Sequence, residues 1–197
     1  MESELVKSFV FEPNDGGAVV DYHAGQYIGI ELTLPNHTYR EIRQYSLSDT
    51  PNGNTYRISV KRETNSTPGV VSNYLHDGLR LGDEVTLYPP AGDFFYTEST
   101  TPLVLISAGV GLTPMQSIVE TLAKNAQQKG HTNHCPEIYY LHACNSTKEH
   151  SFKQRILELS STLPLQHHTW YANEAIEAPQ TYHGFMDISR IKIALPL

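Results

Sequence analysis

The stretch "LVLISAGVGLTPMQSIVETLAK", residues 103–124, decides the fold of the second half of this chain. An apolar run typical of a buried strand leads into Gly109-Val110-Gly111, and apolar residues then recur at helical spacing. Glycines at such a turn let the backbone bend tightly and let a diphosphate approach the amides. We expect Thr113 to cap the helix and Pro114 to be its first residue, so that free amides and the positive end of the helix dipole face an anion.

The glycine turn alone leaves two interpretations open. Its pattern is G-x-G-x-x-P instead of the dinucleotide-binding G-x-G-x-x-G, and no acidic residue stands about twenty residues later. A nucleotide-binding turn and a simple strand-turn-helix corner both fit. Helical patterns over 115–128 and 149–160 alternate with strand-like runs at 137–144 and 166–172, which predicts a parallel, doubly wound sheet.

The first half of the chain has a different sequence pattern, with strand-like runs and no regular alternation with helices. Short strand-like runs, separated by Gly, Pro and Asn, occur at Val19-Val20, 26–34, 55–63 and 84–90. They predict an antiparallel barrel or sandwich. The polar segment 94–102 separates the halves, so we expect two domains, residues 1–98 and 99–197.

A polar tetrad, Arg43-Gln44-Tyr45-Ser46, ends another strand-like run. In an extended strand Arg43 and Tyr45 point to one face, where a guanidinium and a ring together suit a flat, anionic ligand. Ser46 reaches that ligand only if the strand bends or ends there. An exposed arginine beside a cross-strand aromatic is the structural alternative.

A second helix start follows at "GVVSNYLHDGL", residues 69–79. Gly69 gives access to its backbone, Ser72 or Asn73 is the expected cap, and Leu75 is expected to be buried. The segment predicts a second anion-ready helix N-terminus. A glycine that only breaks a strand is the alternative.

Composition excludes several classes of function. The net charge of −7, from 14 basic and 21 acidic residues, offers no surface for nucleic acid. No apolar run approaches the ~20 residues needed to span a bilayer, and the polar start does not resemble a signal peptide, which predicts a cytoplasmic protein. Cys135 and Cys144 are expected as free thiols. We predict no metal site, since His131, His134 and Cys135 lack a fourth ligand, and we expect His167 and His168 at a strand edge.

Taken together, these motifs resemble the ferredoxin-NADP reductase superfamily, and in particular the carboxy-terminal reductase module of flavohaemoglobins, the bacterial nitric oxide dioxygenases. The resemblance rests on "EIRQYSLSD", "GVVSNYLH", "PAGDFF", "LISAGVGLTPM" and "HTWY", and it runs over nearly the whole chain. It implies an antiparallel Greek-key FAD-binding β-barrel, followed by a truncated Rossmann-like parallel-sheet domain for NAD(P)H.

The resemblance also implies roles for single residues. Arg43 would hold the FAD diphosphate, Tyr45 would pack on the isoalloxazine, and Ser46 would face the flavin nitrogen that receives hydride, which makes Tyr45 and Ser46 the candidate catalytic residues. The candidate cofactor-binding residues are Tyr27, Arg43, Gln44, Tyr45, Ser46, Gly69, Val70, Val71 and Ser72 for FAD, and Gly109, Val110, Gly111, Leu112, Thr113 and Pro114 for NAD(P)H.

In such a protein NAD(P)H reduces FAD, and single electrons then pass to haem in a globin domain for nitric oxide detoxification. This chain lacks the family's later Cys-Gly-Pro turn, its terminal aromatic, its usual first strand and a haem domain. A free-standing flavin or ferredoxin reductase, or a truncated module that binds FAD without turnover, are the alternatives. Preference between NADH and NADPH stays open.

Overall fold

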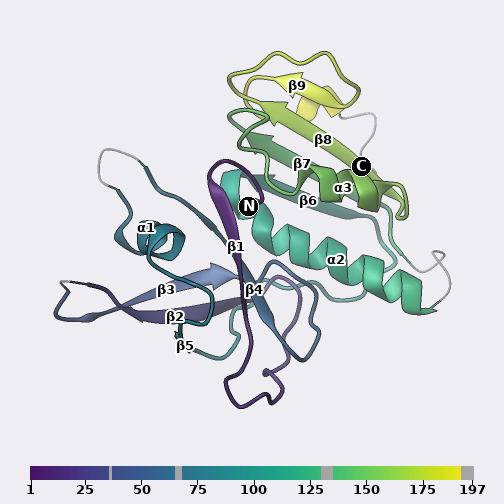
Figure 1. Ribbon diagram of the computed structural model, residues 1–197. Coiled ribbons are helices and arrows are strands. Elements are labelled where there is room, and N and C mark those ends of the chain that lie inside the picture. The colour runs from purple at the N-terminus through teal and green to yellow at the C-terminus, as the bar shows by residue number, and fades with distance from the viewer. Residues whose placement is uncertain (36, 65–67, 130–134, 192–197) are drawn as a thin grey trace.

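The computed structural model describes residues 1–35, 37–64, 68–129 and 135–191 (Figure 1). An antiparallel part comes first and a parallel sheet second. The antiparallel part contains β1 (Val6–Phe11), β2 (Tyr27–Thr33), β3 (Arg40–Ser46), β4 (Tyr56–Lys61), α1 (Val70–Asp77) and β5 (Thr86–Leu87).

The antiparallel strands follow a Greek key. β3, β2 and β5 form one sheet, β1 and β4 form another, and a bridge between Leu47 and Ile58 joins β3 to β4. The spatial order is therefore β1-β4-β3-β2-β5, in which three consecutive antiparallel strands are flanked by β1. Because alternate side chains such as Ile28, Ile30 and Ile58 point inward, the two sheets enclose one apolar core, which confirms the barrel-like fold.

Two details of this part differ from the sequence expectation. Val19-Val20 forms no strand, although the Val20 carbonyl accepts a hydrogen bond from the Tyr56 hydroxyl at 2.6 Å. The run expected over 84–90 shortens to β5, because Pro89 and Pro90 have no amide to donate to a ladder.

The second part is a sheet with strand order β6-β7-β8-β9, all parallel. Its strands begin and end within one or two residues of the apolar runs that predicted them, while β9 was not predicted. The elements are β6 (Leu103–Ala108), the 3₁₀ turn η1 (Gly109–Gly111), α2 (Leu112–Lys129), β7 (Ile138–Cys144), α3 (Lys153–Ser160), β8 (Leu165–Tyr171), β9 (Thr181–His183) and η3 (Ile188–Ile191).

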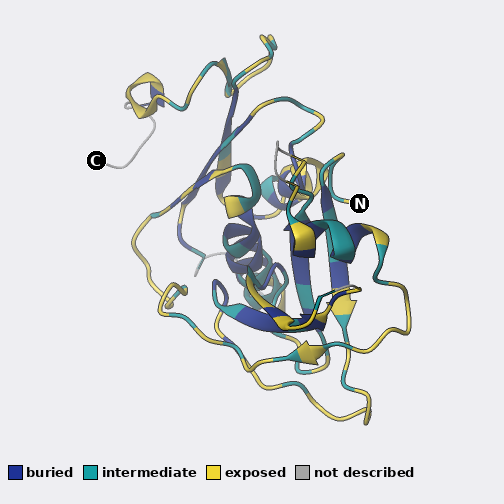
Figure 2. Ribbon diagram, turned by 90° about the vertical axis from the view of Figure 1, so that its left-hand side faces the viewer, coloured by how far each residue is buried: buried dark blue, intermediate teal, exposed yellow. Residues whose placement is uncertain are grey.

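Both helices of this part lie on one face of the sheet. Val119 of α2 and Ile156 of α3 share a core with Leu105 and Tyr140. The opposite face holds a smaller cluster around Trp170, and Ile106 on β6 is 47% exposed there. Within the described residues the sheet is therefore not doubly wound, since that arrangement has helices on both faces. Buried residues concentrate in strands and α-helices, and most connecting loops are exposed (Figure 2).

Candidate functional site

Arg43 and Tyr45 share one face of β3, as the strand period requires. Tyr45 is paired with Ile28 of β2, and Arg43 is paired with Ile30. The Tyr45 ring packs against the barrel core. Burial raises the pKa of Tyr45 to about 12, and the nearby Arg43 charge offsets only part of this rise. Tyr45 therefore presents a neutral phenol beside a cation, which suits an aromatic ligand with an anionic group.

Arg43 is held by the protein's own groups in this structure. Its Nη1 lies 2.9 Å from Glu41 Oε2 and donates to the Ile42 carbonyl oxygen at 2.8 Å. The side chain is 51% exposed. Glu41 is buried, at 9% exposure, whereas Arg43 reaches solvent, so the guanidinium nitrogens other than Nη1 can donate to a phosphate while the ion pair stays formed.

Ser46 is the last residue of β3, as its expected role requires. It is paired with Tyr27, so the two side chains share the face opposite Tyr45. The Tyr27 ring lies against Gly92, where an added Cβ would come within 2.8 Å of the ring. Gln44 is exposed on the same face as Ser46. The structure thus brings Tyr27, Gln44 and Ser46 together, on the other side of β3 from Arg43.

The N-terminus of α1 has free backbone donors. Gly69 occupies the cap position without a side-chain cap, and the amides of Val70, Val71 and Ser72 have no hydrogen-bond partner among the described residues. Such amides, at the positive end of a helix dipole, suit phosphate oxygens. The candidate FAD-binding residues Gly69 to Ser72 therefore fit an anionic diphosphate at this position.

The expectation that Ser72 or Asn73 caps α1 is wrong. The helix begins at Val70, so both residues lie inside it. The Ser72 hydroxyl donates to the Gly69 carbonyl oxygen at 3.2 Å, and the Asn73 amide donates to the carbonyl oxygens of Gly69 and Glu63. These side chains bind the backbone before the helix and leave its first amides unoccupied.

The turn at Gly109–Gly111 leaves space for a ligand. Gly109 has φ +52°, a left-handed conformation that favours glycine. A Cβ added at Gly109 or at Gly111 would meet no atom within 4 Å. Within the described chain, the space above both glycines is open, as close approach of a nucleotide diphosphate requires.

The expected cap of α2 is also wrong. The 3₁₀ turn η1 runs directly into α2, which begins at Leu112, so Thr113 is a helical residue and Pro114 is not the first one. The Thr113 hydroxyl donates to the Val110 carbonyl oxygen at 3.1 Å. Pro114 still fits, because a residue in the first helical turn needs no amide.

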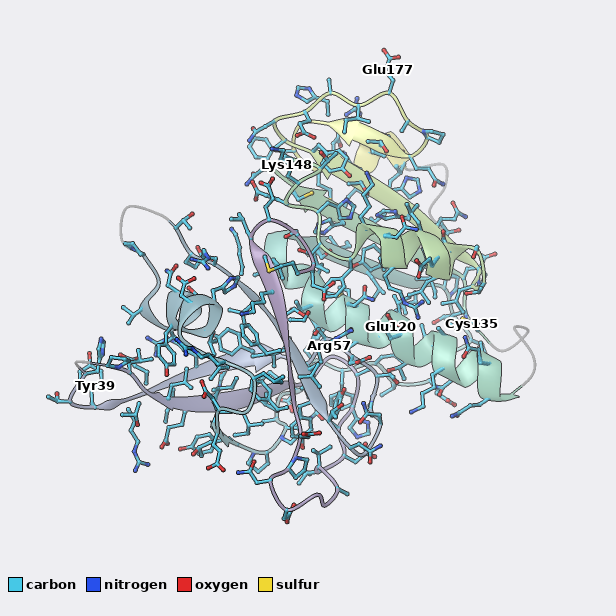
Figure 3. The ribbon with its side chains drawn as sticks, in the orientation of Figure 1. Tyr39, Arg57, Glu120, Cys135, Lys148 and Glu177 are labelled. Atoms are coloured by element: carbon cyan, nitrogen blue, oxygen red, sulfur yellow. The ribbon has the colours of Figure 1, made fainter. Side chains whose placement is uncertain are left out.

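Sequence reasoning missed the segment that follows Ser46. The Asp49 carbonyl oxygen accepts hydrogen bonds from Tyr22 in the barrel and from Ser117 on α2. Arg57, which lies between the barrel strands and α2 in Figure 3, pairs with the Asp49 carboxylate at 3.7 Å. Asp49 appears in the sequence as ordinary turn material, and no local pattern reveals that a distant helix binds it.

Three histidines gather on the helix-covered face of the parallel sheet. The His142 and His150 rings lie 4.8 Å apart, and the His150 and His167 rings lie 5.5 Å apart. His150 Nδ1 is 2.8 Å from the Tyr171 hydroxyl. Burial is the main cause that lowers the pKa of His142 to about 3, of His150 to about 2 and of His167 to about 4.

His167 and His168 lie on the part of β8 that has no described partner strand beyond β7, since β9 pairs only with Thr169 to Tyr171, which agrees with the expected strand edge. His168 is nevertheless 3% exposed. The proposed ligands His131 and His134 lie outside the described residues, and no metal-binding group of three or more His, Cys, Asp or Glu occurs within them. Cys135 and Cys144 are free thiols. None of the described helices is long and apolar enough to cross a bilayer.

Comparison with known proteins gives the family. The Oxidoreductase FAD-binding domain profile matches residues 1–96, and the Oxidoreductase NAD-binding domain profile matches residues 105–195. The chain is 52% identical, over 193 residues, to the flavohemoprotein of Vibrio cholerae, with 97% of this chain and 46% of that protein covered. The chain thus spans about half the length of the curated relatives it matches.

Solved structures agree with this result. The flavohem-like FAD/NAD-binding domain of nitric oxide dioxygenase from Vibrio cholerae superposes with a TM-score of 0.87 at 51% identity, covering 96% of this chain and 76% of that chain. Flavohemoglobin from Malassezia yamatoensis, with bound FAD and heme, gives a TM-score of 0.80 at 25% identity, covering 96% of this chain and 46% of that one. The chain therefore belongs to the FAD- and NAD-binding reductase modules of the flavohaemoglobin family, which are FAD-dependent oxidoreductases.

Proposed function

We propose that this chain is the reductase module of a flavohaemoglobin, in which electrons from NAD(P)H pass through FAD to haem in a globin domain for nitric oxide dioxygenation. FAD supplies the chemistry when bound, because it accepts a hydride and releases electrons singly. The proposal draws support from the Vibrio cholerae relatives, one of which is a nitric oxide dioxygenase. The globin domain would be the electron acceptor and main partner.

The antiparallel part would bind FAD. Arg43 and the free amides of Val70, Val71 and Ser72, which follow the cap residue Gly69, would hold the diphosphate, because each can donate to phosphate oxygens. Tyr45 would contact the flavin ring as a neutral phenol. Tyr27, Gln44 and Ser46, on the opposite face of β3, would contact the flavin where it passes the end of the strand, with Ser46 nearest the reacting atoms.

The segment from Gly109 to Pro114 would bind the NAD(P)H diphosphate in the open space above its glycines. Val110, Leu112 and Thr113 contribute backbone at this turn. The residues after β7, from Asn145 to Lys148, contain neither an acid to bind a ribose diol nor an arginine for a 2′-phosphate. The proposal therefore leaves both NADH and NADPH as substrates.

The observation that carries the proposal is the bond from Ser117 to the Asp49 carbonyl oxygen. Asp49 follows Ser46 closely in the chain, and Ser117 lies one helical turn after Thr113. One hydrogen bond thus joins the end of the flavin strand to the start of the helix that follows the nucleotide turn. Hydride transfer needs such proximity, since the reacting atoms must come within about 3 to 3.5 Å.

The test is FAD titration followed by anaerobic stopped-flow reduction with NADH, NADPH and dithionite. We expect one FAD per chain and reduction by at least one nicotinamide nucleotide. Failure to bind FAD would contradict the proposal. Added globin domain should then be reduced by the loaded module, whereas transfer only to free flavin or to ferredoxin would support a free-standing reductase.

A module that binds FAD without turnover is the second candidate, and the Vibrio cholerae domain, of which this chain covers 76%, gives the comparison for its test. It predicts rapid reduction by dithionite and much slower reduction by NADH than in a chain extended to the length of that domain. Equal NADH rates in the two chains would exclude it.

We also propose a domain boundary at residues 98 and 99, between the two profile matches and between β5 and β6. A cytoplasmic location and the absence of a nucleic-acid partner belong to the same proposal, and the net charge of −7 supports the latter.

A further inference from the structure

One face of α2 is bound to the segment that follows Ser46. Ser117 Oγ donates to the Asp49 carbonyl oxygen at 2.5 Å, the Thr121 hydroxyl lies 3.2 Å from the Thr50 hydroxyl, and Lys124 Nζ donates to the Pro51 carbonyl oxygen at 2.6 Å. These three side chains are spaced by four and three residues, which places them on one stripe of the helix. Successive turns of α2 therefore hold the consecutive residues Asp49, Thr50 and Pro51.

The segment is equally well attached to the barrel. The Leu47 amide donates to the Gln26 carbonyl oxygen at 2.9 Å, and the Ser48 amide donates to the Arg57 carbonyl oxygen at 2.8 Å. The Tyr22 hydroxyl donates to the Asp49 carbonyl oxygen at 2.9 Å, beside the bond from Ser117. A carbonyl oxygen has two lone pairs, so one atom of Asp49 joins the barrel to α2.

Arg57 strengthens the same junction. Its guanidinium donates to the Ser48 carbonyl oxygen and lies 5.5 Å from the centre of the Phe152 ring. Phe152 precedes α3, is 6% exposed and has φ 57°, an unfavourable conformation for a non-glycine residue. A barrel side chain thus reaches the parallel part at a second point, so rotation about the α2 contact alone is opposed.

We infer that Ser117, Thr121 and Lys124 are positioning residues, which fix the nucleotide turn at Gly109–Gly111 relative to the end of the flavin strand at Ser46. This inference rests on the proposed function for its consequence in catalysis. The three residues act through the segment Leu47–Pro51 and lie beyond the proposed cofactor contacts. Because a misplacement of about 1 Å can cost about a hundredfold in rate, loss of this contact is expected to slow hydride transfer while each cofactor still binds.

The test compares two triple variants. Ser117→Ala/Thr121→Val/Lys124→Met removes the polar groups but retains side-chain shape, whereas Ser117→Thr/Thr121→Ser/Lys124→Arg retains the donors. Gln127→Met/Gln128→Met, at exposed positions of the same helix, controls for added apolar surface. Spin labels at exposed Glu84 and Gln166 report the distance between the two parts by pulsed electron resonance, in a Cys135→Ser background.

We expect the first variant to broaden the distance distribution and to lower the NADH reduction rate about tenfold to a hundredfold. FAD affinity, NADH affinity and dithionite reduction should stay at the parental values, and the donor-retaining variant should restore the rate. An unchanged distance distribution would overturn the inference, as would a rate loss that merely follows a loss of FAD. If the parent binds no FAD or is not reduced by NADH, the proposed function fails, and the distance distribution still decides whether these residues hold the two parts together.

Discussion

Tyr27 and Ser46 are paired across β2 and β3, and the Tyr27 ring packs directly against Gly92. Gly92 has φ +105°, so the chain there favours glycine for its backbone as well as for space. A turn that looks like ordinary loop in the sequence therefore supports a proposed flavin-contacting pair.

Replacement of Gly92 by Ala should destabilise the protein and displace Tyr27. The left-handed backbone alone costs about 1 to 3 kcal/mol, and the clash with the ring adds a similar amount. Gly53→Ala is the matched control, because Gly53 has φ +75° but no atom within 4 Å of an added Cβ. Urea unfolding should give a lower free energy for Gly92→Ala than for Gly53→Ala, and equal losses would show that Tyr27 is not held by this contact.

Replacement of Arg43 by Ala should weaken FAD binding. Loss of a charge-assisted hydrogen bond to phosphate costs about 1.5 to 3 kcal/mol, which corresponds to roughly a tenfold to a hundredfold weaker affinity. Arg40→Ala controls for the loss of an exposed ion pair on β3, since Arg40 lies 2.6 Å from Glu31. Superimposable FAD titrations for the two variants would refute the assignment of Arg43.

Replacement of Gly111 by Val should block the nicotinamide nucleotide without unfolding the chain. A Cβ added at Gly111 meets no protein atom within 4 Å, so the new side chain starts in the space proposed for the diphosphate. We expect roughly a tenfold or greater loss of NADH affinity, because the new side chain prevents hydrogen bonds from the backbone amides to the diphosphate. Calorimetric titration of NADH checks this, with FAD affinity in the same samples as the control. A loss of flavin binding instead would reverse the assignment of the two sites.

Stability should fall with acid because of the three buried histidines. Their pKa values of about 3, 2 and 4 in the folded chain lie below the ordinary value of 6.5. The unfolded chain therefore takes up protons first, so the stabilisation is complete above about pH 6.5 and is lost as the pH falls to the folded pKa of each histidine, about 4 for His167, about 3 for His142 and about 2 for His150. Within these windows the slope is about 1.4 kcal/mol per pH unit for each histidine.

Urea unfolding at several pH values measures this slope. His150→Phe should reduce the slope by the share of one histidine, because one proton fewer is bound on unfolding. His183→Phe, at an exposed position of β9, serves as the control. An unchanged slope in His150→Phe would mean that His150 is not the source of the acid sensitivity.

Local sequence patterns predicted most of the strands and helices. The apolar runs predicted at 102–111, 137–144 and 166–172 contain most of β6, β7 and β8, because strand and helix periods are short-range properties of the chain. The strand period likewise puts Arg43 and Tyr45 on one face of β3. The turn residues after Ser46 are also a local signal, and β3 ends at Ser46. The assignment of cofactor contacts to these residues stays a prediction.

The residues that cap the helices were predicted less well from the sequence. Thr113 and Ser72 belong to residue types that often cap helices, yet each lies inside its helix and bonds to backbone preceding it. The first residue of α2 was decided by the way η1 continues into that helix. The first residue of α1 was decided by the way the chain after β4 packs against Gly69. Both are contacts between segments, which residue preference alone does not specify.

By itself the sequence determined the division into an antiparallel and a parallel part, the glycine turn and the order of the cofactor motifs, because each depends on neighbours within a few residues. Only the tertiary structure decided that both helices cover one face of the sheet, that His142, His150 and His167 meet in the interior, and that Asp49 joins the barrel to Ser117. These relations connect residues far apart in the chain. Their energy comes from burial and hydrogen bonds that exist only once the two parts are folded against each other.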